Sequence, residues 1–205
     1  MSDLPIGPLV DATPRPLPPR GTKLHGQYVE LEPLHPRHAP DLWRATEAGT
    51  PRGDASWTYL GYGPFPSQAA LEKFIADFAA KFDHVVWAVR PIATGVASGW
   101  LTLMSIEPAN SAIELGNIWL APVMQRTRAA TEAMFLPLKL AADDLGYRRL
   151  VWKCNALNAP SRRAAGMRSW AGWMRPISGR TARRGAASRR SARRCPRSGD
   201  AFTDF

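Results

Sequence analysis

Five short stretches of the chain have the hydrophobic pattern of β-strands. Some alternate polar and apolar side chains, as half-buried strands do, and others are continuous apolar runs bounded by turn residues. The predicted strands are residues 27–32, 85–89, 97–106, 113–120 and 149–153. Turn residues at 91–95 join the second and third strands as a hairpin. The apolar character of the fourth indicates a place in the middle of a sheet.

Apolar residues at helical spacing predict four helices, three of them between these strands and one after the last strand. One is expected over residues 36–48, and a second begins after Ser67, a residue type that commonly caps helix N-termini. A third runs from about residue 128 to 145, where Gly146 is well placed to end it, and a last helix starts at 161–165. Pro137 lies inside the third helix, where proline typically costs about 3 kcal/mol or kinks the helix.

The order of these elements is β-α-α-β-β-β-α-β-α, with a β-α-β crossover over residues 113–155. Such an order predicts the α+β class, a mixed sheet with helices packed on it. A chain of 205 residues with 45% hydrophobic residues can bury a sizeable core as one domain.

Composition places the protein away from membranes and oxidising compartments. No run of 18 apolar residues predicts a membrane span, and residues 1–20 lack the pattern of a secretory signal. The cysteines, Cys154 and Cys195, show neither a disulfide framework nor metal-ligand spacing, and we interpret Cys154 as a small buried residue. We therefore expect a cytoplasmic, metal-free protein, either a monomer or a homodimer.

The net charge of +10 is confined to one end of the chain. Residues 1–161 hold 15 basic and 15 acidic residues, whereas residues 162–205 hold 12 arginines and two aspartates. Composition thus divides the chain into a Pro-rich flexible arm (1–22), a structured domain (23–165) and an Arg-rich, disordered tail (166–205). The tail would attract nucleic acid through phosphate contacts, but only non-specifically.

The segment Gln-Arg-Thr-Arg-Ala-Ala-Thr-Glu at 125–132 carries the candidate chemistry, because it leads from the central strand into a helix. A helix N-terminus presents unpaired backbone N–H groups and a positive dipole end, which together suit a pyrophosphate. Ala129 and Ala130 are small enough to let a phosphate approach the backbone, and Arg126 and Arg128 add positive charge. A solvated basic surface is the alternative for the two arginines.

This segment resembles the acetyl-CoA loop of the GNAT N-acetyltransferases, Gln/Arg-x-x-Gly-x-Gly/Ala, with Arg128 at the middle glycine. With Ile113–Trp119 before it and Asn155-x-x-Asn158-x-x-Ser161 after it, the chain resembles the branch containing the RimJ/RimL-like ribosomal-protein N-terminal acetyltransferases. The resemblance covers about residues 23–165. It implies the GNAT fold and transfer of an acetyl group from acetyl-CoA to a primary amine by direct attack.

The resemblance also implies roles for particular residues. Acetyl-CoA would lie between the strands at 113–120 and 149–155, and Glu114 matches a position where relatives keep a catalytic base. The matching cofactor positions are Ile118, Trp119, Leu120, Gln125, Arg126, Thr127, Arg128, Ala129, Ala130, Asn155, Asn158 and Ser161. Glu114 could instead face solvent or pair with an arginine, and Asn155 and Asn158 could cap the following helix.

The aromatic residues between the first two predicted helices allow two interpretations. They are Trp57, Tyr59, Tyr62 and Phe65. In the family that this chain resembles, the corresponding region often borders the acceptor site. Packing in the core, or a lid over the site, explains the same residues.

The chain departs from the family pattern after Ala165. Relatives continue with two more strands, whereas this chain continues with the Arg-rich tail, so we expect the last strands of the fold to be missing. We interpret the tail as an out-of-frame translation product, with a natural disordered tail as the alternative. An inactive remnant of the enzyme and a nucleic-acid- or ribosome-binding protein are the competing functions.

Overall fold

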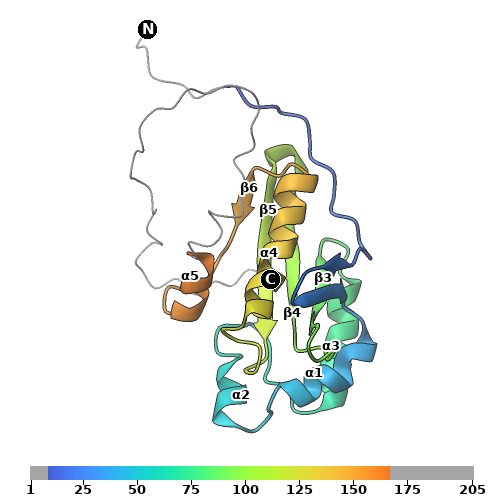
Figure 1. Ribbon diagram of the computed structural model, residues 1–205, viewed down its shortest axis with the longest axis vertical. Helices are drawn as coiled ribbons and strands as arrows, with labels where there is room; N and C mark the ends of the chain where they lie inside the picture. Colours follow the sequence, from blue (N-terminus) through green and yellow to red (C-terminus); the bar gives the residue numbers. More distant parts are fainter. Residues whose placement is uncertain (1–8, 167–205) are drawn as a thin grey trace. The chain divides into compact units, whose positions relative to one another are not determined.

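A six-stranded sheet forms the centre of the protein in a computed structural model that describes residues 9–166 (Figure 1). The strands are β1 (Leu24–His25), β2 (Val29–Pro33), β3 (Val85–Pro91), β4 (Gly99–Glu107), β5 (Ala112–Leu120) and β6 (Arg149–Val151). They lie in sequence order, and all neighbours are antiparallel except β5 and β6, which are parallel. The predicted mixed sheet is confirmed, together with the hairpin of β3 and β4. The predictions for residues 167–205, including the missing strands and the frame change, lie outside the described residues.

The chain divides into two units, residues 1–153 and 154–205, and each is described by itself. The first holds the sheet and the helices α1 (Ala39–Ala45), α2 (Pro51–Ala55), α3 (Gln68–Ala80) and α4 (Arg128–Lys139). The second holds α5 (Ala159–Ala165). The predicted division at residues 22 and 165 stays a prediction.

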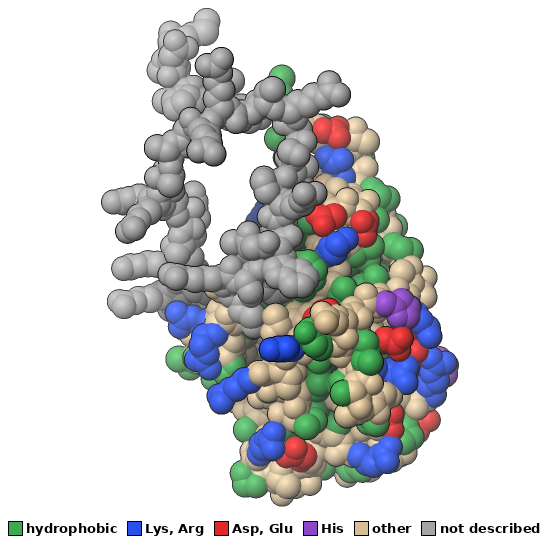
Figure 2. All heavy atoms as spheres, viewed as in Figure 1, with side chains coloured by type: hydrophobic (Ala, Val, Ile, Leu, Met, Phe, Trp, Pro, Cys, Tyr) green, Lys and Arg blue, Asp and Glu red, His purple; other side chains and the backbone are tan. Residues whose placement is uncertain are grey.

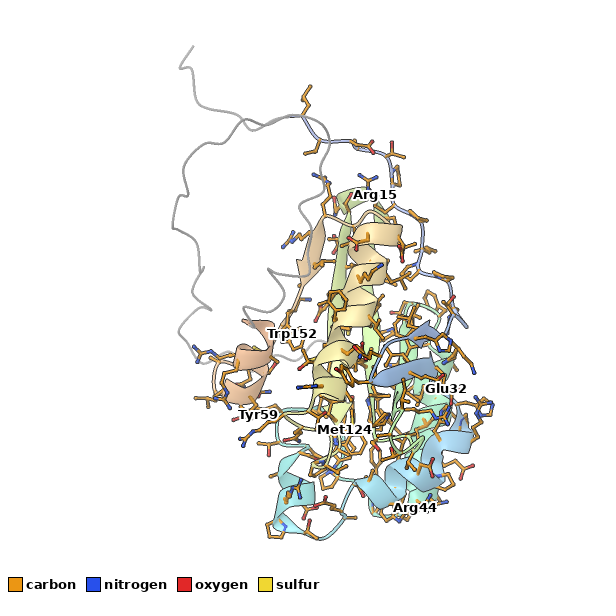
Figure 3. The ribbon with its side chains drawn as sticks, viewed as in Figure 1. Arg15, Glu32, Arg44, Tyr59, Met124 and Trp152 are labelled. Atoms are coloured by element: carbon orange, nitrogen blue, oxygen red, sulfur yellow. The ribbon has the colours of Figure 1, made fainter. Side chains whose placement is uncertain are left out.

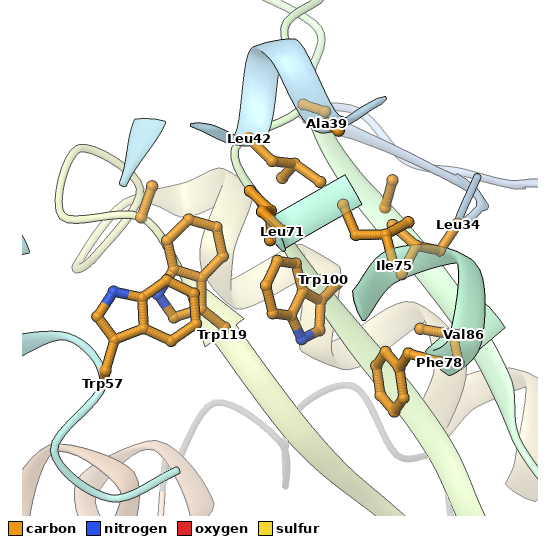
Figure 4. Packing of buried hydrophobic residues seen from close by; sticks show 13 residues of the cluster. Leu34, Ala39, Leu42, Trp57, Leu71, Ile75, Phe78, Val86, Trp100 and Trp119 are labelled. Carbon is orange, nitrogen blue, oxygen red and sulfur yellow. The ribbon is translucent and has the colours of Figure 1, made fainter. Parts of the chain in front are cut away.

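One face of the sheet packs against α1 and α3. Successive side chains of a strand point to opposite faces, so Trp100 and Trp119, which are register partners on β4 and β5, lie on the same face. Leu42 from α1 and Leu71 and Ile75 from α3 pack over them, and all of these side chains are buried (Figure 4). The residues that alternate with Trp100, such as Leu101 and Leu103, point to the face that carries α4.

The helix boundaries were predicted correctly in some places and not in others. Ser67 caps α3 as predicted, since its Oγ accepts the N–H of Ala70 at 3.2 Å. The helix expected over residues 36–48 is shorter: a 3-10 turn at Pro36–His38 precedes α1, which ends at Ala45. The short helix α2, capped by Thr50, was not predicted.

Pro137 is buried inside α4 without ending it, so α-helical structure continues to Lys139. Proline has no N–H to donate one turn back, and the chain widens to a π-helix, η3 (Leu140–Asp144), three residues later. The Leu145 N–H donates to the Leu140 carbonyl at 3.0 Å. Gly146 follows with a positive φ of 74°, which confirms its expected role in ending the helix.

Part of the N-terminal segment, residues 15–22, makes hydrogen bonds with later residues of the first unit. The Arg15 guanidinium donates from Nε to the Ser111 hydroxyl at 3.2 Å, and the Tyr147 hydroxyl donates to the Pro16 carbonyl at 3.1 Å. The Trp87 indole N–H donates to the Thr22 carbonyl at 2.7 Å. The flexibility of the whole arm over residues 1–22 stays a prediction.

Candidate active site

The strands β5 and β6 pair over only three residues each and then separate. Their register ends at Glu114 opposite Val151. Beyond Glu114, within the described part of the first unit, residues 116–120 of β5 pair with β4 alone. A strand whose outer edge is unpaired offers backbone N–H and C=O groups to an extended ligand. The location of acetyl-CoA between these two strands, which the resemblance implied, stays a prediction.

A bulge in β5 marks the same place. Thr102 pairs with Gly116 and Trp100 with Trp119, so β5 has one more residue than β4 between these two pairs. Asn117, inside this stretch, has a left-handed φ of 46°. A bulge bends the strand and turns its edge, which helps to part β5 from β6.

The carboxylate of Glu114 lies at the point where the strands part. Its side chain is 7% exposed, and the ammonium of Lys153, which is 61% exposed, lies 2.7 Å from Oε2. This contact is an ion pair, and Oε2 makes no hydrogen bond with the described residues. The alternative in which Glu114 pairs with a basic residue is therefore observed, with lysine in place of arginine.

A second buried oxygen lies on the same face of the sheet. The hydroxyl of Thr102 is fully buried and has no hydrogen-bond partner within residues 9–166. Thr102 is the register partner of Gly116, and Gly116 is two residues from Glu114, so all three point to one face. Buried polar atoms without partners are rare in native structures, and those at a site fit a polar ligand or an ordered water.

The turn between β5 and α4 holds the residues that sequence assigned to the phosphate loop. Met124 is buried in this turn (Figure 3), and its carbonyl accepts the Thr127 hydroxyl at 2.8 Å. Thr127 is the N-cap of α4, since its Oγ1 accepts the N–H of Ala130 at 3.1 Å. The Ala130 N–H is therefore already bonded, which leaves the earlier N–H groups of the helix start for a phosphate.

The other loop residues face outward. Gln125, Arg126 and Arg128 are exposed, and Arg126 has a left-handed φ of 64°. The Gln125 amide donates to the Leu120 carbonyl at 3.2 Å, which ties the loop to the end of β5. Ala129 is partly exposed in the first turn of α4. Exposed N–H groups, small side chains and two guanidinium groups fit a pyrophosphate, and the edge of β5 fits an amide-bearing chain.

A carboxylate one turn into α4 holds this helix against the first hairpin. Glu132 accepts the backbone N–H groups of Gln27, Tyr28 and Val29 at 2.8, 2.6 and 3.1 Å. Arg128 lies over the Tyr28 ring, 5.8 Å from its centroid. The sequence reasoning missed Glu132, because its partners are about a hundred residues away and no local pattern connects them.

The aromatic residues between α1 and α3 are mostly core. Trp57 is 3% exposed and stacks on Trp119 with ring centroids 4.5 Å apart. Tyr62 packs on Phe74 and its hydroxyl accepts the Trp100 indole N–H at 3.2 Å; burial raises the pKa of Tyr62 well above its usual value. The core-packing interpretation is thus confirmed for Trp57 and Tyr62, whereas Tyr59 is 45% exposed. The Trp119 side chain belongs to this core, so only its backbone is available to a cofactor.

The remaining predicted cofactor residues lie in the second unit. Asn158 is the N-cap of α5, because its Oδ1 accepts the Ser161 N–H at 3.1 Å, and the Asn155 Oδ1 accepts the Leu157 N–H at 2.8 Å. The alternative of capping and turn residues is therefore observed, while cofactor contacts from Asn155, Asn158 and Ser161 stay a prediction. Cys154 is partly exposed, so the expectation that it is buried is wrong.

No group of His, Cys, Asp and Glu side chains within residues 9–166 has an arrangement that would hold a metal ion. No described helix combines the length and the apolar character that crossing a membrane requires.

Comparison with known proteins agrees with this geometry. Residues 29–167 match the family described as Acetyltransferase (GNAT) domain. A GCN5-related N-acetyltransferase from Brucella melitensis is 39% identical, with a TM-score of 0.71 over 75% of this chain and 69% of its own. A probable GNAT-family acetyltransferase from Chromobacterium violaceum is 36% identical, with a TM-score of 0.70 over 80% of each chain. The search of curated proteins gave no match.

The fold, the separated strands and these matches define an acyltransferase. The chain belongs to the GNAT acetyltransferase family. A ribosomal-protein-serine acetyltransferase structure from Vibrio cholerae shares the fold at 20% identity, with a TM-score of 0.59 over 70% of this chain and 80% of its own.

Proposed function

We propose that the protein transfers an acetyl group from acetyl-CoA to a primary amine, with Glu114 as the base. The observation that carries this proposal is the parting of β5 and β6 at Glu114, with the capped N-terminus of α4 following the same strand. Bound acetyl-CoA supplies the activated acetyl group. Its pyrophosphate would meet the start of α4, and its pantetheine arm would pair with the backbone of residues 118–120.

The chain's own residues supply the rest of the chemistry. An amine must lose its proton before it attacks a thioester, and a carboxylate within hydrogen-bond reach accepts that proton, directly or through a water. Glu114 is suited to this role because it is buried on the face that also carries the unpartnered Thr102 hydroxyl. Arg126 and Arg128 are exposed beside the helix start, where they would neutralise phosphate charge.

The acceptor is proposed to be a protein N-terminus or a small-molecule amine, and the chain is proposed to belong to the RimJ/RimL-like branch. Support for that branch is the motif at 113–132 and the fold shared with the Vibrio cholerae protein. A cytoplasmic location agrees with a chain that shows no disulfide framework. Varying the acceptor amine tests the branch separately from the chemistry.

The experiment measures release of free CoA thiol from acetyl-CoA with a panel of peptides and small amines. Glu114→Gln removes the base but keeps the shape of the side chain, and loss of a general base typically slows turnover by about 10²–10⁴-fold. Glu107→Gln, at the exposed end of the neighbouring strand β4, is the matched control and should retain the wild-type rate. Equal rates for both variants would exclude Glu114 as the base.

A further inference from the structure

Lys153 holds a primary amine at the place where the proposed reaction needs one. Its Nζ lies 2.7 Å from Oε2 of Glu114. Lys153 follows Val151, the last residue of β6 that pairs with β5, by two residues. A base can accept a proton from an attacking amine only within hydrogen-bond reach, so the nitrogen of any acceptor must lie beside Glu114. The Lys153 nitrogen already occupies that position.

We propose that Lys153 is an internal acetyl acceptor, so that the protein acetylates itself at this residue when it binds acetyl-CoA. The inference rests on the proposed function, because it requires acetyl-CoA between β5 and β6 and Glu114 as the base. It adds a modification site, and it makes Lys153 a competitor of the external amine for the acetyl group. Holding a reacting group in place beside its base raises the rate strongly over the same reaction in solution.

The exposure of Lys153 gives its side chain room to move beside Glu114. The Lys153 side chain is 61% exposed and follows the end of β6 by two residues, whereas the Glu114 side chain is 7% exposed and belongs to β5. Gly116, two residues along β5 on the same face, carries no side chain that would fill this space. An added Cβ there would lie only 3.1 Å from Oε1 of Glu114 and 2.9 Å from Sδ of Met104.

The transfer balances without any further reactant. The Lys153 ammonium gives one proton to Glu114, and the neutral amine attacks the acetyl carbonyl carbon. An amide bond forms from Nζ to that carbon, the C–S bond of the thioester breaks, and the electron pair leaves with the sulfur. The thiolate takes the second proton lost by the nitrogen, and Glu114 returns its proton to water. The products are acetyl-Lys153, CoA thiol and one released proton.

The modification is self-limiting. An acetylated lysine is neutral and its amide nitrogen is no longer a nucleophile, so each chain is modified once. The ion pair with Glu114 is lost at the same time, and the carboxylate becomes free for the ammonium of an external acceptor. Self-acetylation would therefore remove an internal competitor from the site.

Another ion-paired lysine provides a matched reference within the same molecule. Lys73 on α3 is also 2.7 Å from a carboxylate oxygen, that of Asp77, and its side chain is 78% exposed. Direct chemical acetylation by acetyl-CoA depends on exposure, so it would label Lys73 at least as fast as Lys153. Acetylation that depends on the site would favour Lys153 and would depend on Glu114.

The test incubates the full chain with acetyl-CoA that carries an isotope-labelled acetyl group and no other amine. Peptide mass spectrometry then follows labelled acetyl on Lys153 and Lys73 over time. We expect Lys153 to be labelled at least roughly tenfold faster than Lys73, because it is held beside its base. Glu114→Gln should bring Lys153 down to the rate of Lys73, and Lys153→Arg should remove the fast label while calorimetry still detects acetyl-CoA binding.

Equal labelling of the two lysines, or a Lys153 rate that Glu114→Gln leaves unchanged, overturns the inference. Thiol release with the external amine panel, measured on the same sample, separates this failure from that of the proposed function. If external amines are acetylated through Glu114 but Lys153 is not labelled, only the self-acetylation is wrong. If acetyl-CoA neither binds nor turns over, the proposed function fails as well.

Discussion

The carboxylate of Glu132 is expected to stabilise the fold and to fix the start of α4. It accepts three consecutive backbone N–H groups from residues 27–29. A hydrogen bond to a charged group contributes about 1.5–3 kcal/mol, but Gln27 and Tyr28 are exposed and their N–H groups regain water when the carboxylate is removed. The net loss in Glu132→Gln is therefore about 2–3 kcal/mol rather than the sum of three bonds.

Urea unfolding measures this loss directly. The midpoint of Glu132→Gln should fall at an unchanged slope, and Glu72→Gln, at an exposed position of α3, should match the wild type. Gly26→Ala gives a second route to the same contact, since any side chain at Gly26 would collide with the Glu132 carboxylate. Acetyl-CoA should also bind more weakly to both disrupting variants, because the N-terminus of α4 is no longer held. A Glu132→Gln midpoint equal to that of Glu72→Gln would refute the reasoning.

Two other side chains give separate tests of the fold. Burial raises the pKa of Glu32, but the hydrogen bond with His38, together with Lys23 and Arg90, outweighs it and lowers this pKa from 4.5 to about 2. The resulting stabilisation, about 3 kcal/mol, is present above pH 4.5 and is lost as the pH falls towards 2. Urea midpoints of the wild type and Glu32→Gln should thus differ most at about pH 7, and the difference should shrink below pH 4.5 and be nearly gone at about pH 2; a constant difference would contradict this. Trp57→Ala should cost about 3–5 kcal/mol, and the exposed Tyr59→Ala less than about 1, whereas similar small losses would favour a lid.

The sequence was most informative where the signal was local. Alternation and apolar runs located β2 to β6, and Ser67 and Gly146 marked ends of helices, because caps depend on residues a few positions apart. The short helix α2 was missed even though Thr50 and Pro51 form a recognisable start, since it has too few residues for an apolar stripe. The two-residue strand β1 has no pattern of its own.

The candidate site needed tertiary information. The segment 125–130 was placed correctly at the start of α4, because a strand followed by a helix is readable from the sequence. The partners of Glu114 and Glu132 could not be predicted from the sequence. The contact of Glu114 with Lys153 depends on the parallel register of β5 and β6, and the hydrogen bonds of Glu132 depend on the approach of β1 and β2 to α4. For Trp119 the resemblance implied a cofactor contact, but the structure places its side chain in the core, which leaves only its backbone for that role.

The most direct test of the account is the affinity of acetyl-CoA for the variant Arg128→Glu, measured by calorimetry. Arg128 is exposed in the first turn of α4, where an acidic residue suits the helix dipole, so the fold should be retained. Reversing a charge next to a phosphate in water changes the interaction by about 2 kcal/mol, or roughly thirtyfold in Kd. Lys73→Glu changes the net charge equally on α3 and should bind like the wild type. A thirtyfold loss confined to Arg128→Glu is the predicted result, and equal Kd values for the two variants would contradict acetyl-CoA binding at the start of α4.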